Sequence, residues 1–319
     1  MIGLLAMFVA LCALAWALAA GAAQWLSRYS FEALPPKRRL HRFTLLALLP
    51  WLLPASWAAA LAGVALSKRV GWIDDHCRIH GDGHPHLCFE HFPAIQIEPL
   101  AGAALLMVLA AVTTVVVRHA WAALARRGRL AALLRLVPSN GLVRKIDDER
   151  PLAMVARPLR PVVLVSRGLF DCLDARERRI VIAHEAAHLR GRDLIKSSLF
   201  ECLLTFHLPA SAARLRAHWR QAIEERADDR VARRFGGADT AQALLKVVRR
   251  QQFPATVGLA AGGADIARRV ERLLAAGEPS AVSRDWSTVA LGLAVLVPAA
   301  WLAGAHHAIE TVLGVILGS

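Results

Sequence analysis

The chemistry that this sequence displays most clearly lies in the stretch HEAAH at residues 184–188, an HExxH motif. Positions four apart share one face of an α-helix, so the imidazoles of His184 and His188 can hold one metal ion. Glu185 lies beside that ion, where its carboxylate can act as a general base. The apolar residues before the motif bury one side of this helix, which argues against two incidental histidines on a solvated surface. The motif therefore predicts a zinc peptidase, in which zinc activates a water molecule and Glu185 takes its proton.

A third zinc ligand has to come from another part of the chain, because a catalytic zinc usually takes three protein ligands and keeps a fourth position open. Glu224 and Asp228 are again four apart and share one helix face. Glu224 could bind the metal while Asp228 accepts the other N–H of a ligand histidine. Glu225 is the neighbouring alternative and points about 100° away around the helix. Taken alone, these residues would also suit the solvated face of a charged helix.

A group that stabilises the oxyanion of the reaction is harder to choose. Tyr29 is the only tyrosine and lies in the first charged loop, so no tyrosine of the peptidase segment is available. His207, His218 and Arg220 are the candidates, and their residue types leave the choice open.

Several stretches together resemble the antirepressor-type membrane metallopeptidases, the BlaR/MecR type. These are HEAAHLRGRD at 184–193, PVVLVSRGL at 161–169 and the element Glu224-x-x-Ala227-Asp228. The resemblance implies that His184, His188 and Glu224 are zinc ligands and that Glu185 is the general base. It also implies that Asp193 and Asp228 lie behind the ligands and orient them. HtpX-like membrane proteases share a similar set of residues and are the close rival.

The resemblance also implies a function. Members of the BlaR/MecR type cleave themselves or a cytoplasmic repressor after an outside signal, and they lie in the bacterial inner membrane. Members that sense β-lactams carry a large sensor domain after the last helix, which this sequence lacks, so direct β-lactam sensing is not expected. Quality control of membrane proteins is the HtpX-like alternative. A receptor or metal sensor with a structural zinc site is the alternative of another class, but a structural site needs no base, so Glu185 favours the enzyme.

The composition predicts a membrane protein, since 56% of the residues are hydrophobic and the mean hydropathy is +0.41. Uncharged stretches reach or approach the roughly 20 residues that span a bilayer, and inside lipid they should be helices. They cover residues 2–26, 43–67, 99–117 and 286–309. Pro50 and Pro54 should kink the second. The first could instead be a signal peptide, but it carries no basic residue.

Basic residues give the orientation by the positive-inside rule. The loop 27–42 has five basic residues and one acid, and 118–285 has 31 basic and 18 acidic residues, so both should be cytoplasmic. The loop 67–99 has three basic and five acidic residues, so it and the N-terminus should be outside. Attraction to anionic lipid explains the basic segment, and no nucleic-acid motif is present. The expected partners are the lipid bilayer and a protein or peptide substrate, such as a repressor, and an oligomer remains open.

These inferences predict a mainly α-helical membrane protein with four transmembrane helices. A three-helix membrane domain (1–120) with an outer loop (68–98) precedes a cytoplasmic, mostly helical gluzincin-type zinc peptidase domain with a small β element (121–285). The last transmembrane helix and a short outer tail (286–319) follow. In the outer loop, Cys77 and Cys88 could form a disulfide. Its five histidines could bind a metal, although their spacing matches no closed structural zinc site.

Local patterns predict the elements of the peptidase segment. Two short extended runs, 152–156 and 162–166, should be strands. The second could be an edge strand that aligns a substrate or, equally, a strand of the core. Asp174 should cap the helix that carries the motif. Residues 194–208 are too polar for a fifth span and fit an interfacial or membrane-packed helix. Further helices are predicted at 211–235, ending at Gly236, and at 266–274.

Overall fold

The computed structural model describes residues 2–72, 143–156, 162–250, 259–275 and 286–305, together with a few isolated positions between 107 and 121 and position 308. The predicted third span at 99–117 lies almost wholly outside these residues. So do most of the outer loop and the proposed Cys77–Cys88 pair.

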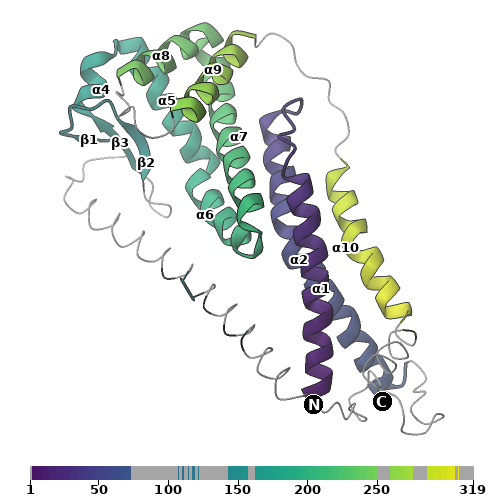
Figure 1. Ribbon diagram of the computed structural model, residues 1–319. Coiled ribbons are helices and arrows are strands. Elements are labelled where there is room, and N and C mark those ends of the chain that lie inside the picture. The colour runs from purple at the N-terminus through teal and green to yellow at the C-terminus, as the bar shows by residue number, and fades with distance from the viewer. Residues whose placement is uncertain are drawn as a thin grey trace.

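Three long apolar helices lie side by side at one end of the molecule (Figure 1). They are α1 (Ile2–Leu26), α2 (Pro36–Val70) and α10 (Ser287–Gly304). Each contains a stretch long and apolar enough to cross a membrane, which agrees with three of the four predicted spans. Small residues of α1 pack against α2 and α10 in a cluster with Leu49, Leu53 and Val295.

Helix α2 begins earlier than the uncharged stretch within it. Pro36 suits the first helical turn, where its missing N–H costs nothing, and the basic residues after it continue the same helix. Its 35 residues correspond to about 52 Å, well over the roughly 30 Å of a bilayer core. The basic first turns of α2 therefore extend beyond the apolar layer. The helix runs through Pro50 and Pro54 and ends at Gly71, whose φ of 77° closes a left-handed cap.

A three-stranded sheet lies at the other end of the molecule. Strands β1 (Val143–Ile146), β2 (Ala153–Ala156) and β3 (Val162–Ser166) are arranged in the order β1-β3-β2. β3 pairs in parallel with β1 and antiparallel with β2. Of the two roles left open for 162–166, the structure shows the core strand and not the edge strand: every residue of β3 is buried, because both of its faces are apolar, and β1 and β2 are the edge strands.

Helices follow the sheet and carry most of the peptidase segment. Asp174 starts α5 with a capping box, accepting from the backbone amide of Glu177 while Glu177 accepts from that of Asp174, which confirms the predicted cap. The helix predicted at 211–235 is confirmed as α7, which ends at Gly236. In order, the elements are α4 (Arg167–Cys172), α5 (Ala175–Gly191), α6 (Asp193–Leu203), the 3₁₀ turn η2 (Leu204–Phe206), α7 (Pro209–Phe235), α8 (Gly237–Arg250) and α9 (Leu259–Ala275).

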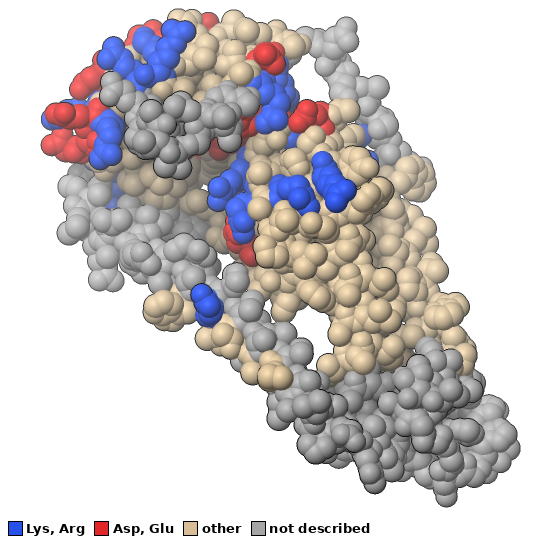
Figure 2. Space-filling model, in the orientation of Figure 1, with Lys and Arg blue, Asp and Glu red and all other residues tan. Residues whose placement is uncertain are grey.

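One hydrophobic core joins the long helix α2 to the peptidase segment. Leu40, Phe43 and Ala47 of α2 pack with Phe200 and Leu204 and with residues 212–223 of α7. Phe200 and Trp219 stack with ring centroids 4.1 Å apart. The charged side chains gather on the end that holds the sheet and α8, whereas the surface over α1 and α10 is almost free of them (Figure 2). The peptidase segment is thus fixed to the apolar helices by packing as well as by the chain.

Candidate metal centre and active site

Helix α5 presents the two histidines of the motif toward one point. Their Nε2 atoms are 3.1 Å apart, and their ring centroids are 4.7 Å apart. The helix ends just beyond them at Gly191, and Arg192 takes a left-handed conformation with φ 52° that redirects the chain into α6.

Helix α7 brings Glu224 to the same point. Its Oε2 lies 3.3 Å from Nε2 of His184, and its Oε1 lies 3.7 Å from Nε2 of His188. One ligand atom from each of the three residues lies within 4.8 Å of the others, and this is the metal-ligating group found among the described residues. Glu225, the alternative ligand, points away from this group and is buried against Arg39 of α2 at 2.6 Å.

The electrostatics of this group favour a positive charge between its ligand atoms. Burial opposes a charged ring at His184, but hydrogen bonds to Asp228 and Glu224 outweigh it and raise the pKa of His184 to about 10. Burial likewise opposes a charged Glu224, yet His184, Arg269 and His188 lower the pKa of Glu224 to about 2. Two imidazoles and one glutamate form a known donor set of catalytic zinc. The residues present therefore fit a zinc ion.

Each histidine is held from behind by an aspartate. Nδ1 of His184 lies 3.1 Å from Asp228, and Nδ1 of His188 lies 2.8 Å from Asp193. These contacts occupy the rear nitrogen of each ring and leave Nε2 for a metal. The residue types alone did not say which aspartate serves which histidine.

Two arginines that no sequence pattern had marked hold the aspartates in turn. Arg269 of α9 binds Asp228 through Nε and Nη2 at 2.7 and 2.9 Å. Arg226 of α7 pairs with Asp193. Gly191 packs so closely on this second pair that a Cβ there would collide with both side chains. Arg269 lies 41 positions from Asp228 in a chain with 39 basic residues, so no local pattern marks it.

Glu185 lies beside the ligands and is 9% exposed. Burial is the main cause that raises the pKa of its carboxyl group, and the neighbouring histidines and a hydrogen bond from the backbone of Val155 in β2 oppose it. A carboxyl group with a raised pKa next to a metal-ligating group is suited to accept and return a proton.

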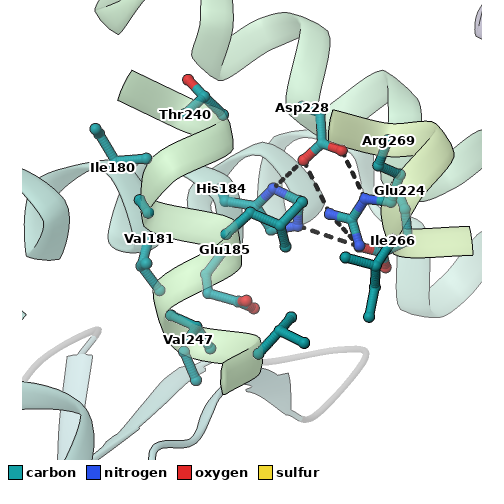
Figure 3. A pocket seen from close by; sticks show the side chains of 14 residues that line it. Ile180, Val181, His184, Glu185, Glu224, Asp228, Thr240, Val247, Ile266 and Arg269 are labelled. Atoms are coloured by element: carbon teal, nitrogen blue, oxygen red, sulfur yellow. Dashed lines mark hydrogen bonds and ion pairs between the residues drawn. The ribbon is translucent and has the colours of Figure 1, made fainter. Parts of the chain in front are cut away.

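Two cavities open on either side of Glu185. One, of about 280 Å³, has Glu224, Asp228 and Arg269 on one side, with Ile266 beside them, and the apolar residues Ile180, Val181 and Val247 on the other (Figure 3). The other, of about 370 Å³, runs along β2 and is more polar, with Asp193, Ser197 and Arg220 in its wall. The site is therefore an open cleft whose two halves differ in polarity.

Of the three oxyanion candidates, only Arg220 lines the cleft among the described residues. Nε2 of His207 lies 3.2 Å from the backbone oxygen of Ala47, and the ring of His218 stacks on Phe43 with centroids 5.4 Å apart. Both histidines are thus packed against α2, so they are not available to the site.

The structure combines apolar helices, a His-His-Glu group, a buried glutamate beside it and an edge strand. These features are typical of a metallopeptidase attached to a membrane. A comparison with family models gives the more particular result: residues 153–271, from β2 to α9, match the model of peptidase family M48. No curated protein and no solved structure matches the chain. The match supports an M48 metallopeptidase, a family that is typically zinc-dependent, and it leaves the BlaR/MecR-like and HtpX-like types unseparated.

Proposed function

We propose that this chain is a membrane-embedded zinc-dependent endopeptidase that cleaves itself or a cytoplasmic regulator of the repressor type. The observation that carries the peptidase activity is the convergence of His184, His188 and Glu224 within 4.8 Å, with the buried carboxylate of Glu185 beside them. The family match over 153–271 supports the same activity.

The three ligand residues would hold the ion, and Asp228 and Asp193 would keep the two rings in the orientation that binds it. When bound, zinc lowers the pKa of a water molecule and polarises the carbonyl of the scissile bond. Glu185 accepts the proton of the attacking water at its carboxylate and returns it to the leaving amine. Arg220, exposed in the wall of the larger cavity, can donate hydrogen bonds to the oxyanion.

Strand β2 offers the backbone against which a peptide substrate can align. The amide of Ser166 donates to the oxygen of Leu152 at 2.8 Å, which sets the pattern of this antiparallel pair. In this pattern the backbone N–H and C=O of Met154 point toward β3, whereas the backbone groups of Ala153 and Val155 point away from β3. Both residues line the cleft next to Glu185. An extended substrate added to this edge would pass the ligands and Glu185.

The role of the peptidase follows from the resemblance to the antirepressor type, and quality control of membrane proteins is the alternative. Substrate trapping distinguishes them. In cells, the inactive Glu185→Ala variant should be recovered with its own chain uncleaved or bound to one uncleaved regulator. Recovery of many misfolded membrane proteins with the variant would favour quality control.

The activity is tested by purifying the full chain in detergent and comparing zinc content and cleavage of itself or casein in wild type and Glu185→Ala. Glu271→Gln, which changes an exposed carboxylate of α9, is the matched control. One zinc per chain in all three, with cleavage in wild type and the control only, is expected. Absence of zinc from the wild type would overturn the proposal, and zinc without cleavage would favour a structural site.

A further inference from the structure

The hairpin formed by α6, η2 and α7 packs its tip against the apolar helices α1 and α2. The indole N–H of Trp16 donates to the backbone oxygen of Phe206 at 2.9 Å, and that of Trp51 donates to the oxygen of Leu203 at 2.8 Å. Trp16 belongs to α1 and Trp51 to α2, and both lie inside stretches apolar and long enough to cross a membrane. The turn of the hairpin therefore lies beside the apolar part of these helices.

Contacts along α7 show that its beginning is the part nearest to the middle of α1 and α2. Arg214 donates to Ser27 at 3.1 Å and to the oxygen of Gln24 at 3.2 Å, at the end of α1. Farther along, Glu225 meets Arg39 near the start of α2. Trp16, which meets the tip, lies ten residues before Leu26. This corresponds to about 15 Å along the axis of α1.

The outward face of the hairpin tip is apolar. Leu199 is 60% exposed and Leu208 is 37% exposed. Cys202 and Ala213 are exposed as well. Between Ser197 and Ala213 the one charged residue is Glu201, and it is paired with Arg216 at 2.7 Å. In water such a surface would be unfavourable, whereas in lipid each exposed apolar side chain is in a matching solvent.

We propose that the hairpin tip, residues 199–213, is inserted into the bilayer leaflet in which α1 ends and α2 begins, and that its outward face contacts lipid acyl chains. The tip contacts α1 and α2 directly, through Trp16 and Trp51, so the lipid that surrounds these helices would extend over it. Arg214 and Arg216 then lie where the charged part of the molecule begins. The insertion fixes the height of the cleft, because Glu224 lies ten residues beyond Arg214 on the same helix. Glu224 is thereby held about 15 Å farther along the axis of α7 than Arg214.

The test measures the surroundings of a fluorescent probe attached to single cysteines of the full chain in phosphatidylcholine nanodiscs. Cys202 is native to the tip and needs no substitution in the hairpin, while the other cysteines are replaced by serine. Ala213→Cys and Arg233→Cys, each in a chain without Cys202, place the probe at exposed positions near the beginning and near the end of α7. Arg233→Cys is the matched control, because it lies about 30 Å from Ala213 on the same helix.

At Cys202 and Ala213→Cys we expect blue-shifted emission, several-fold stronger quenching by nitroxide-labelled lipid than at the control, and several-fold weaker quenching by iodide. Zinc content and thermal unfolding show that each labelled chain is folded. If folded chains labelled at Cys202 and Ala213→Cys were quenched by iodide as strongly as the control, the tip would lie in water and the proposal would be overturned. Shielding from both quenchers would also overturn it, because a protein would then cover this face.

Discussion

At the scale of single residues, the candidate metal centre has two layers of contacts behind its ligand atoms. Each of the two histidine rings contacts an aspartate, and each aspartate contacts an arginine. His184, Asp228 and Arg269 form one such chain, and His188, Asp193 and Arg226 form the other. A ligand that is held in this way loses little further freedom when it binds an ion, so the outer residues should matter for affinity.

Asp228→Asn and Asp193→Asn should each weaken zinc binding by about 10- to 100-fold, because the amide no longer favours the ring orientation that exposes Nε2. Competition with a chelator of known affinity measures this. Asp239→Asn, which changes the aspartate that pairs with Arg176 on the surface, should leave zinc binding unchanged. Wild-type affinity in both site variants would show that the aspartates do not position the ligands.

Gly191→Ala should weaken zinc binding and destabilise the chain by about 1–3 kcal/mol, because the added Cβ displaces Asp193 and Arg226. Chelator competition and thermal unfolding measure the two effects. Gly63→Ala is the control, since no atom of the described residues would lie within 4 Å of a Cβ at that helical position. A Gly191→Ala chain with unchanged zinc affinity would mean that the neighbouring side chains move aside at no cost to His188.

At the scale of elements, the cap at the start of α5 should contribute to stability without affecting the metal-binding residues farther along the helix. Asp174→Ala removes the side-chain acceptor for the first amides of the helix and should cost about 1 kcal/mol of stability. Zinc affinity should remain unchanged, because the cap lies more than two turns before His184. Asp174→Ser should recover most of the loss. Thermal unfolding of the three chains measures the effect, and equal stability of all three would contradict it.

The buried pair between Arg39 and Glu225 fixes α7 to α2. Both side chains are 2% exposed. Glu225 also accepts a hydrogen bond from the side-chain amide of Gln221 at 2.7 Å, and its Oε2 lies 3.4 Å from Nη1 of Arg272. Within the described part of the chain, Nε and Nη2 of Arg39 have no hydrogen-bond partner, so we expect Arg39 to depend on Glu225 more than Glu225 depends on Arg39.

Glu225→Met should therefore destabilise the chain by about 3–5 kcal/mol, since it removes the carboxylate that is paired with the buried guanidinium of Arg39. Arg39→Met should cost less, because Gln221 and Arg272 still serve Glu225, and the double variant should recover part of the loss. A double-mutant cycle of unfolding free energies in detergent measures the coupling. Additive losses would show that the two residues do not interact.

At the scale of the whole molecule, the family match covers 153–271, but the core of that segment reaches beyond it. Phe43 and Ala47 of α2 are fully buried against Leu215, Trp219 and other residues of α7 and α6. We expect that residues 143–275 produced alone will expose this apolar face, bind a hydrophobic dye and aggregate. Size-exclusion chromatography and dye fluorescence, compared with the full chain in the same detergent, measure this. A monomeric segment that binds zinc would mean that the shared core is dispensable.

The sequence was sufficient where the physics is local. The HExxH spacing, the cap at Asp174, the end of α7 at Gly236 and three apolar helices all depend on residues close together in the chain. It was insufficient where distant segments meet. β1 is short and carries two basic residues, so it lacked a strand pattern. The central place of β3 depended on pairing with β1. Arg226 and Arg269 look like any other basic residues until α7 and α9 fold beside the motif. The division into domains and the orientation in the membrane stay predictions.

The ion pair between Arg39 and Glu225 can form only late in the synthesis of the chain. The two residues are 186 positions apart. At about 5–20 residues per second, α2 leaves the ribosome roughly 10–40 s before α7 is complete. During this delay, water or lipid phosphates have to solvate the guanidinium of Arg39. The apolar face of α2 around Phe43 also remains without its packing partners from α6 and α7. A nascent chain that stalls between these two helices would thus present an unfinished membrane segment, whose charge is neutralised only when translation resumes.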